Sequence, residues 1–171
     1  LKVCCQLAHA GKVAINPVVL DINTATDAEI EATVKKFAEA AVRAEKAGYD
    51  CVQLHSGHDY FLSQTISDYY NTRTDEYRAA DFKVLREALA ACKAAVHIPV
   101  GVKLQCDDFI EGHTMNPEQA ANILSALDFD FVEITGGGQE KAKYSTIRKS
   151  NDTYYYRHVV SVFSERNLLK K

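Results

Sequence analysis

The sequence has no tryptophan, one methionine, three prolines and no run of about 18 apolar residues of the kind that crosses a membrane. Positive charge is not in excess either, because 20 Lys and Arg residues stand against 23 Asp and Glu residues, for a formal net charge of −3. A chain without a positive field lacks the main source of affinity for nucleic acids and anionic lipids. Composition therefore predicts neither a nucleic-acid partner nor a membrane partner.

Cysteines are few and odd in number, and their spacing does not suit a metal site. The five are Cys4, Cys5, Cys51, Cys92 and Cys106, and no two of them form a C-x-x-C pair. The pattern argues against a disulfide framework and favours a reducing compartment, so we expect a cytoplasmic protein. With 171 residues, the chain is long enough to bury the core of one domain.

Short apolar segments alternate with amphipathic ones along the chain. Each apolar segment is bounded by turn residues or by a helix, which is typical of buried strands. The predicted strands are Val3–Leu7, Cys51–His55, Val100–Leu104 and Phe131–Thr135.

Helix signals lie between these strands. Thr26 and Glu29 form a T-x-x-E capping box, and apolar residues follow at helical spacing until Gly48. Asn116 followed by Pro117 is the pattern of an N-cap with proline in the first turn. The sequence predicts helices over about 27–47, 81–97 and 117–127.

Strand–helix alternation implies parallel strands joined by right-handed crossovers. The segments GYDCVQLHSG and DFDFVEITGG share one pattern, and repeated βα units favour a (β/α) barrel over a doubly wound sheet. A whole (β/α)₈ barrel needs roughly 200 residues or more. The predicted fold class is therefore α/β, of the (β/α)₈ TIM-barrel type, present as a partial barrel of about four βα units.

A dense group of ring side chains follows the second predicted strand. His55, His58 and Tyr60 leave the core where that strand ends, which is where α/β folds keep their chemistry. The H-x-x-H pair could also hold a metal, although no neighbouring Cys or His completes a set at the usual spacing. Tyr60 could instead pack as an ordinary aromatic residue, and Gln6 could be a strand-end amide that caps a loop. Lys103 is a charge within an apolar strand, which usually indicates a partner or a role.

Five segments resemble, in family order, successive motifs of the old yellow enzyme family. They are QLAHAGK at 6–12, AGYDCVQLHSGHDYFLSQ at 47–64, NTRTDEY at 71–77, PVGVKL at 99–104 and EITGGG at 133–138. The family consists of FMN-dependent ene-reductases on a (β/α)₈ barrel, and it includes 12-oxophytodienoate reductases and the flavin domain of 2,4-dienoyl-CoA reductases. The resemblance implies FMN as cofactor, NAD(P)H as reductant and a small α,β-unsaturated carbonyl compound as substrate.

The resemblance also implies roles for five residues. Gln6 would bind the flavin pyrimidine edge, and Lys103 would lie beside flavin N1 and O2. His55 and His58 would hold the substrate carbonyl oxygen. Tyr60 would donate a proton to the α-carbon, and a phenol with a pKa near 10 suits that task because it stays protonated at neutral pH. No residue is assigned to a metal.

The sequence also departs from the family pattern. Asp59 stands where a glycine is common, RAAD follows NTRTDEY in place of a glycine turn, and nothing after Gly138 resembles the family's phosphate-binding loops. Gly136, Gly137 and Gly138 are a weak phosphate signal and could equally form a flexible loop. We expect residues 1–140 to be the central βα units of a flavin-binding barrel. Residues 141–171 are polar and Tyr-rich, with one possible helix near Tyr156–Leu168.

Three interpretations follow from the sequence. The first is a fragment or truncated form of a flavin-dependent ene-reductase. The second is a non-catalytic remnant half-barrel that lacks the cofactor and self-associates through its open sheet edges, as a homo-oligomer. The third is another (β/α) enzyme that uses His55 and His58 for acid–base or metal chemistry. Outside the site, Arg73, Asp75 and Glu76 are expected to form a structural ion-pair network.

Overall fold

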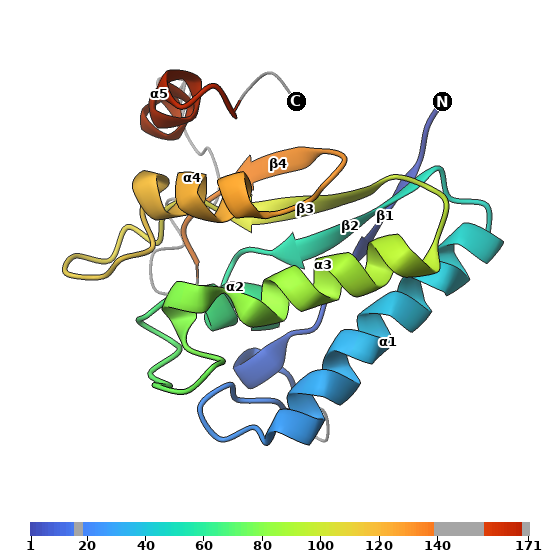
Figure 1. The fold of residues 1–171 in the computed structure, drawn as a ribbon, viewed down its shortest axis with the longest axis horizontal. Coiled ribbons are helices and arrows are strands. Elements are labelled where there is room, and N and C mark those ends of the chain that lie inside the picture. Colours follow the sequence, from blue (N-terminus) through green and yellow to red (C-terminus); the bar gives the residue numbers. More distant parts are fainter. Residues whose placement is uncertain (16–18, 139–155, 169–171) are drawn as a thin grey trace.

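The computed structural model describes residues 1–15, 19–138 and 156–168. Its centre is a parallel four-stranded sheet in the order β1-β2-β3-β4 (Figure 1). Each predicted strand is present within one residue of its expected bounds. The strands are β1 (Cys4–Leu7), β2 (Cys51–Ser56), β3 (Val100–Gln105) and β4 (Val132–Thr135).

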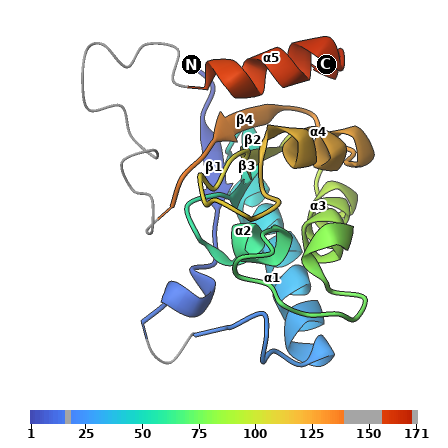
Figure 2. The same ribbon diagram turned by 90° about the vertical axis from the view of Figure 1, so that its left-hand side faces the viewer.

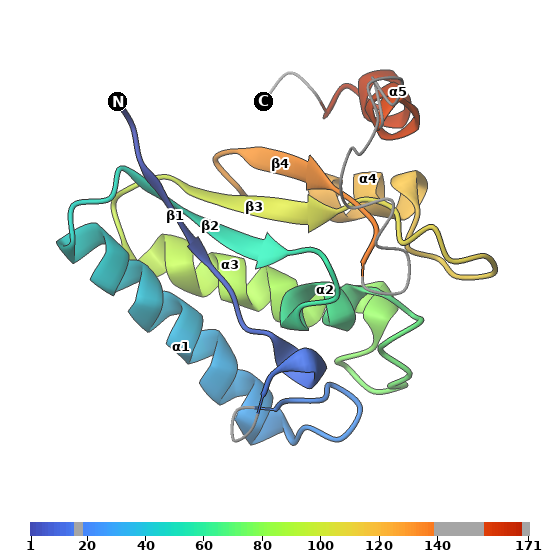
Figure 3. The same cartoon turned by 180° about the vertical axis from the view of Figure 1, so that it is seen from behind.

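The crossover helices lie on one face of this sheet (Figure 2). They are α1 (Asp27–Lys46), α3 (Lys83–Ala95) and α4 (Pro117–Ala126), and α1 packs against α3. Figure 3 looks onto the opposite face, which these three helices leave uncovered. A doubly wound sheet would carry crossover helices on both faces, whereas a barrel carries them only outside. The fold is thus a partial (β/α)₈ barrel, as predicted.

Alternation along the strands separates an apolar face from a polar one. Val52, Leu54, Val102 and Leu104 are fully buried in the core that the strands share with the helices. The residues between them point to the uncovered inner face, and many of these are polar. None of the helices in the described part of the chain has the length and apolar character that a bilayer crossing requires.

The predicted helix starts are confirmed at two of three helices. At α1 the Thr26 hydroxyl accepts the Glu29 N–H (3.3 Å) and the Glu29 carboxylate accepts the Thr26 N–H (2.8 Å), which completes the capping box. At α4 the Asn116 side chain accepts the Gln119 N–H at 3.1 Å. The expected start of the second helix at Asp81 is wrong.

That helix, α3, begins at Lys83 because Phe82 adopts the left-handed conformation (φ 38°). Asp81 instead ends a 3-10 turn, η2 (Ala79–Asp81), and its carboxylate binds the Arg78 guanidinium at 2.8 Å. A carboxylate engaged by a neighbouring arginine does not cap the helix.

Besides η2, two short helical segments were not predicted, whereas the C-terminal helix was. The 3-10 turn η1 (Gly11–Val13) and the helix α2 (Phe61–Ile66) are too short for a helical period, and α2 is buried on every side. The helix expected near residues 156–168 is α5 (Arg157–Glu165), which packs beside α4. Residues 139–155 and 169–171 lie outside the described residues, so the division of the chain at residue 140 remains a prediction.

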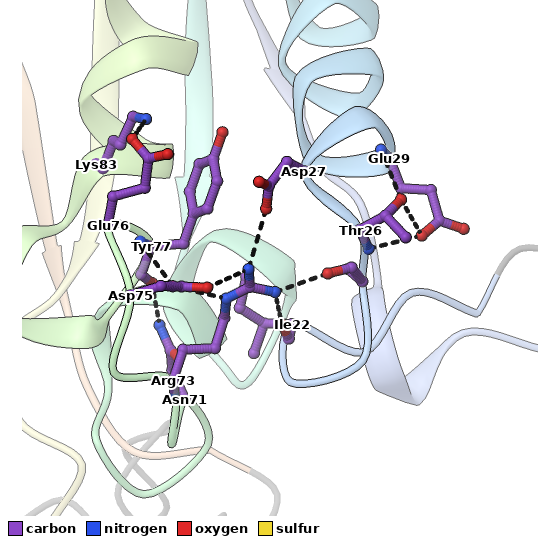
Figure 4. Close-up of polar contacts among 11 residues, drawn as sticks. Ile22, Thr26, Asp27, Glu29, Asn71, Arg73, Asp75, Glu76, Tyr77 and Lys83 are labelled. Carbon is purple, nitrogen blue, oxygen red and sulfur yellow. Dashed lines mark hydrogen bonds and ion pairs between the residues drawn. The ribbon is translucent and has the colours of Figure 1, made fainter.

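Arg73 holds the loop after α2 against the start of α1 (Figure 4). Its guanidinium contacts the carboxylates of Asp75 (2.5 Å) and Asp27 (3.1 Å) and donates to the carbonyl oxygens of Ile22 (3.2 Å) and Ala25 (2.6 Å). The predicted pair between Arg73 and Asp75 is confirmed. The remaining acid of the predicted network, Glu76, pairs with Lys83 instead.

Arg73→Ala is expected to lower the free energy of unfolding by roughly 2–4 kcal/mol, because it leaves two carbonyls and two carboxylates without their cation. The matched control is Arg78→Ala, which removes a more exposed pair with Asp81 and should lower the free energy of unfolding much less. Urea denaturation of both variants measures the difference. Equal losses would show that Arg73 is only a surface ion pair.

Candidate active site

Three ring side chains meet at the carboxyl end of β2. The His55 and His58 ring centroids lie 5.3 Å apart, and the His55 and Tyr60 centroids lie 5.0 Å apart, both edge-to-face. His55 is 5% exposed, whereas His58 and Tyr60 are half-buried. The structure therefore brings together the three residues that the sequence placed at one strand end.

A tight turn over residues 57–59 orients these rings. His58 (φ 56°) and Asp59 (φ 62°) are both left-handed, a conformation that costs non-glycine residues about 1–3 kcal/mol each. The left-handed backbone at position 59 is a conformation that glycine adopts more readily than aspartate. Gly57 has no room for a side chain, because a Cβ atom would lie 2.6 Å from the Thr135 methyl group. The turn closes with the Tyr60 N–H donating to the Gly57 carbonyl at 3.2 Å.

Both imidazoles are held neutral. Burial lowers the pKa of His55 to about 4, assisted by the nearby His58 and Lys103. Burial and the Lys103 charge also lower the pKa of His58. The buried Nδ1 of His55 has no hydrogen-bond partner among the described residues. A buried polar atom without a partner is costly, so this nitrogen is available to a ligand.

A hydrogen-bonded chain crosses the inner face of the sheet below the rings. Gln6 donates to the Gln53 side chain (2.6 Å), Gln53 donates to Glu133 (3.1 Å), and Lys103 pairs with the other Glu133 oxygen (2.9 Å). Gln6 and Lys103 therefore belong to one network. Lys103 is not an isolated cation, because the Glu133 carboxylate offsets its charge.

Sequence reasoning missed Gln53 and Glu133. The signal was present in the alternation of V-Q-L and V-E-I, because each polar residue stands between two core residues of a strand. Strand register explains why these side chains meet, because Gln53 lies opposite Gln6 across β1 and β2 and Glu133 lies opposite Lys103 across β3 and β4.

A second, deeper network supports the turn that carries His58. Gln105 accepts the His58 N–H (3.0 Å) and donates to Asp108 (2.8 Å) and to the Gly137 carbonyl (2.9 Å). Ser67 donates to the other Asp108 oxygen at 2.5 Å. Asp108 is 4% exposed, and burial raises its pKa to about 6. The network ties the ends of β3 and β4 to the loop that follows α2.

Asp108 should make stability depend on pH. Its pKa in the folded state, about 6, lies above the ordinary value of 3.8, so its favourable contribution is present below pH 3.8 and is lost as the pH rises through 6. A shift of about two units corresponds to about 3 kcal/mol. The side chain that Asp108→Asn introduces cannot ionise. The free energy of unfolding of this variant should therefore rise relative to that of the wild type by about this amount as the pH increases from 4 to 7.

Denaturant unfolding of both proteins across this range measures the difference. His55 contributes with the opposite sign, because its depressed pKa makes the folded state less stable as the pH falls from 6.5 to 4. The difference between the two proteins cancels that contribution. If the free energies of unfolding of the two proteins changed in parallel with pH, the pKa of Asp108 would not be raised in the folded state.

The cleft between β1 and α1 lies away from these rings. It has a volume of about 360 Å³, and its walls include Gln6, His9, Phe37 and Arg43 but none of His55, His58 or Tyr60. The sheet edge at β1 is where another βα unit packs in a closed barrel. Among the residues that the structure describes, no three His, Cys, Asp or Glu side chains gather closely enough to hold a metal ion.

Comparison with known proteins identifies relatives of this chain. The model of the NADH:flavin oxidoreductase / NADH oxidase family matches residues 5–160. The NADPH dehydrogenase of Bacillus cytotoxicus is 30% identical over 154 residues, which are 80% of this chain and 44% of that protein. The NADH-dependent flavin oxidoreductase nadA of Aspergillus parasiticus is 33% identical over 145 residues, 80% of this chain and 31% of that protein. The chain thus spans less than half the length of these relatives.

Solved structures show the same fold. Histamine dehydrogenase from Rhizobium sp. 4-9 superposes with a TM-score of 0.74 at 18% identity, over 94% of this chain and 28% of that chain. Morphinone reductase in complex with tetrahydroNAD has a TM-score of 0.57 at 25% identity, over 65% of this chain and 33% of that chain. Together with the family match, these likenesses confirm the resemblance that the motifs indicated: the chain belongs to the NADH:flavin oxidoreductase / NADH oxidase family, the old yellow enzyme family, in which FMN is the cofactor and NAD(P)H the reductant.

Proposed function

We propose that the protein to which this chain belongs is an ene-reductase, which reduces the C=C bond of α,β-unsaturated carbonyl compounds with NAD(P)H through FMN. The observation that carries the proposal is the meeting of two neutral imidazoles and a phenol at the end of β2. Neutral imidazoles can bind a carbonyl oxygen without a net positive charge. A phenol beside them can supply a proton to the neighbouring carbon.

The inner face offers donors and acceptors that suit a flavin. After its bond to Gln53, the Gln6 amide still has a second N–H and its carbonyl oxygen, and Lys103 still has N–H groups beyond the one directed at Glu133. The pyrimidine edge of FMN presents carbonyl acceptors and a ring N–H, so this donor set fits it. We assign Gln6 and Lys103 to that edge.

Each side chain then has one task in the reaction. FMN, when bound, supplies the hydride that reaches the β-carbon of the substrate. His55 and His58 bind the carbonyl oxygen and stabilise the negative charge that develops on it. Tyr60 gives its proton to the α-carbon. The buried site keeps water away from His55, which strengthens these interactions. We also propose a cytoplasmic location, in keeping with five free cysteines and the cellular pool of NAD(P)H.

The first test is flavin retention by the chain itself. The purified chain is mixed with FMN, desalted and examined by visible absorbance, and the retained flavin is then tested for reduction of a simple cyclic enone by NADPH. Retained flavin together with enone reduction supports the proposal. A colourless protein, or one that oxidises NADPH without reducing the enone, contradicts it for this chain.

Self-association is a second candidate, favoured by the two outer strands of the sheet, which pair on one side only within the described residues. β1 and β4 are the outer strands of the four, and Val3, beside β1, is 47% exposed. Unpaired strand edges are templates for pairing with another chain. We propose that a half-barrel without cofactor would pair through them as a homo-oligomer. Sedimentation velocity tests this, because a concentration-independent monomer would exclude it.

A further inference from the structure

Glu133 ends a hydrogen-bond relay that starts at Gln6 and passes through Gln53. One carboxylate oxygen of Glu133 accepts the Gln53 side-chain N–H at 3.1 Å, and the other pairs with the Lys103 ammonium at 2.9 Å. The Gln53 oxygen accepts the Gln6 side-chain N–H at 2.6 Å. The sequence motifs assigned no role to Gln53 or Glu133. The relay therefore adds two side chains to those already assigned to the site.

The chemistry of Lys103 and Glu133 fixes the direction of the relay. A lysine ammonium can only donate hydrogen bonds, and an ionised carboxylate can only accept them. Burial on its own would raise the pKa of Glu133, but the bonds from Lys103 and Gln53 lower it below its ordinary value, so the group is ionised at neutral pH. Both Glu133 oxygens therefore face donors. The Gln53 amide must turn its NH2 group to Glu133 and its oxygen to Gln6, and Gln6 must turn its NH2 group to Gln53.

Burial keeps the Gln53 amide in this orientation. Gln53 is 6% exposed, so its partners are protein groups, whereas Gln6 is exposed. If the Gln53 amide turned over, its oxygen would face a Glu133 oxygen and its NH2 group would face that of Gln6. Both contacts set like groups against each other, which is costly for a buried amide. The side chains of the relay come from strands, so their backbone positions are fixed by the register of the sheet.

We propose that Glu133 is a positioning residue that, through Gln53, holds the Gln6 amide with its oxygen end directed away from Gln53 and available to a ligand. Gln6 then offers that oxygen as an acceptor and its second N–H as a donor, and Lys103 offers its remaining N–H groups. The complementary ligand edge carries an N–H beside carbonyl oxygens, which is a cyclic imide. The flavin pyrimidine edge is of this kind. The identity of the ligand rests on the proposed function, whereas the orientation of the amide does not.

Glu133→Gln should reverse the relay, although it changes the size of the side chain very little. The new side chain has one oxygen and one NH2 group, and Lys103 can pair only with the oxygen. The NH2 group then faces Gln53, which turns its own oxygen toward position 133 and its NH2 group toward Gln6. Gln6 presents its oxygen to Gln53 and its NH2 group to the ligand. The variant therefore offers a ligand the opposite end of the Gln6 amide.

Nuclear Overhauser contacts of the side-chain amides in the ¹⁵N-glutamine-labelled chain test this orientation without FMN or substrate. In the wild type the Gln53 NH2 protons should contact the Glu133 side-chain methylenes, and in Glu133→Gln they should contact those of Gln6 instead. Glu39→Gln, which changes an exposed glutamate beside Lys35 on α1, is the matched control and should leave both glutamine signals unchanged. Wild-type Gln53 NH2 protons that contact Gln6 would overturn the proposal, as would an unreversed amide in a folded Glu133→Gln variant.

Binding of FMN and of FMN methylated at N3 separates this inference from the proposed function. Methylation removes the imide N–H that the Gln6 oxygen would accept. In fluorescence titrations the preference of the wild type for FMN over the methylated flavin should fall about fivefold in Glu133→Gln, the factor given by one hydrogen bond of about 1 kcal/mol. An unchanged preference would overturn the assignment of an imide ligand. A chain that binds neither flavin but shows the wild-type amide orientation would contradict the proposed function and support the role of Glu133.

Discussion

Replacing Tyr60 with phenylalanine is expected to slow enone reduction by the FMN-loaded protein by a factor of roughly 10² to 10⁴, the usual contribution of a positioned general acid. The substitution removes one oxygen and keeps the ring that packs 5.0 Å from His55. Oxidation of NADPH with a simple electron acceptor should continue at the wild-type rate, because that half-reaction needs no proton from the phenol. Stopped-flow absorbance separates the two half-reactions.

The control for this prediction is Tyr69→Phe, which alters an aromatic residue that is 39% exposed. It should leave both half-reactions unchanged. A Tyr60→Phe enzyme that reduces the enone at the wild-type rate would remove Tyr60 from the mechanism. Equal slowing of both half-reactions would indicate instead that Tyr60 shapes the flavin site and donates no proton.

Phe61→Ala should lower the free energy of unfolding by about 3–5 kcal/mol, a large part of the roughly 5–15 kcal/mol that stabilises a typical domain. Phe61 is fully buried at the start of α2, its ring packs on His9, and its N–H donates to the His9 carbonyl at 2.8 Å. The cavity would lie beside His9, at the start of the helix that follows Tyr60. Thermal and urea unfolding measure the loss.

Ile15→Ala is the comparison, since Ile15 is 89% exposed and its truncation should change stability by no more than about 0.5 kcal/mol. A Phe61→Ala loss close to that of Ile15→Ala would mean that α2 is not part of the cooperative core. A large loss of stability with intact ring contacts between His55 and Tyr60 would show that α2 supports the site without shaping it.

The sheet and its barrel type could be predicted because the signals are local. Each strand is an apolar run between turn residues, and the capping residues Thr26 and Asn116 mark two helix starts directly. The start of α3 could not be predicted in this way. Asp81 has the chemistry of a cap, but its carboxylate binds Arg78. No local pattern indicates that Phe82 adopts a left-handed conformation.

The candidate site was predictable where its residues follow one another in sequence. His55, His58 and Tyr60 lie within six positions, so one strand end brings them together, and their roles in catalysis remain proposals. The residues that orient them come from far along the chain. Gln105 and Thr135 reach His58 across 47 and 77 positions, and only the register of three strands makes them neighbours.

That register has a consequence for folding. Polar and apolar residues alternate on β3, so a slip of one residue against β2 would turn Lys103 into the layer of helices and would expose Val102 and Leu104 on the inner face. An ammonium group in an apolar core is costly enough to exclude that pairing. Lys103, which is proposed to bind the cofactor, therefore also helps to select the correct register of β3 against β2 during folding. Substitutions that make this face apolar for the sake of stability would be expected to yield a mixture of strand registers.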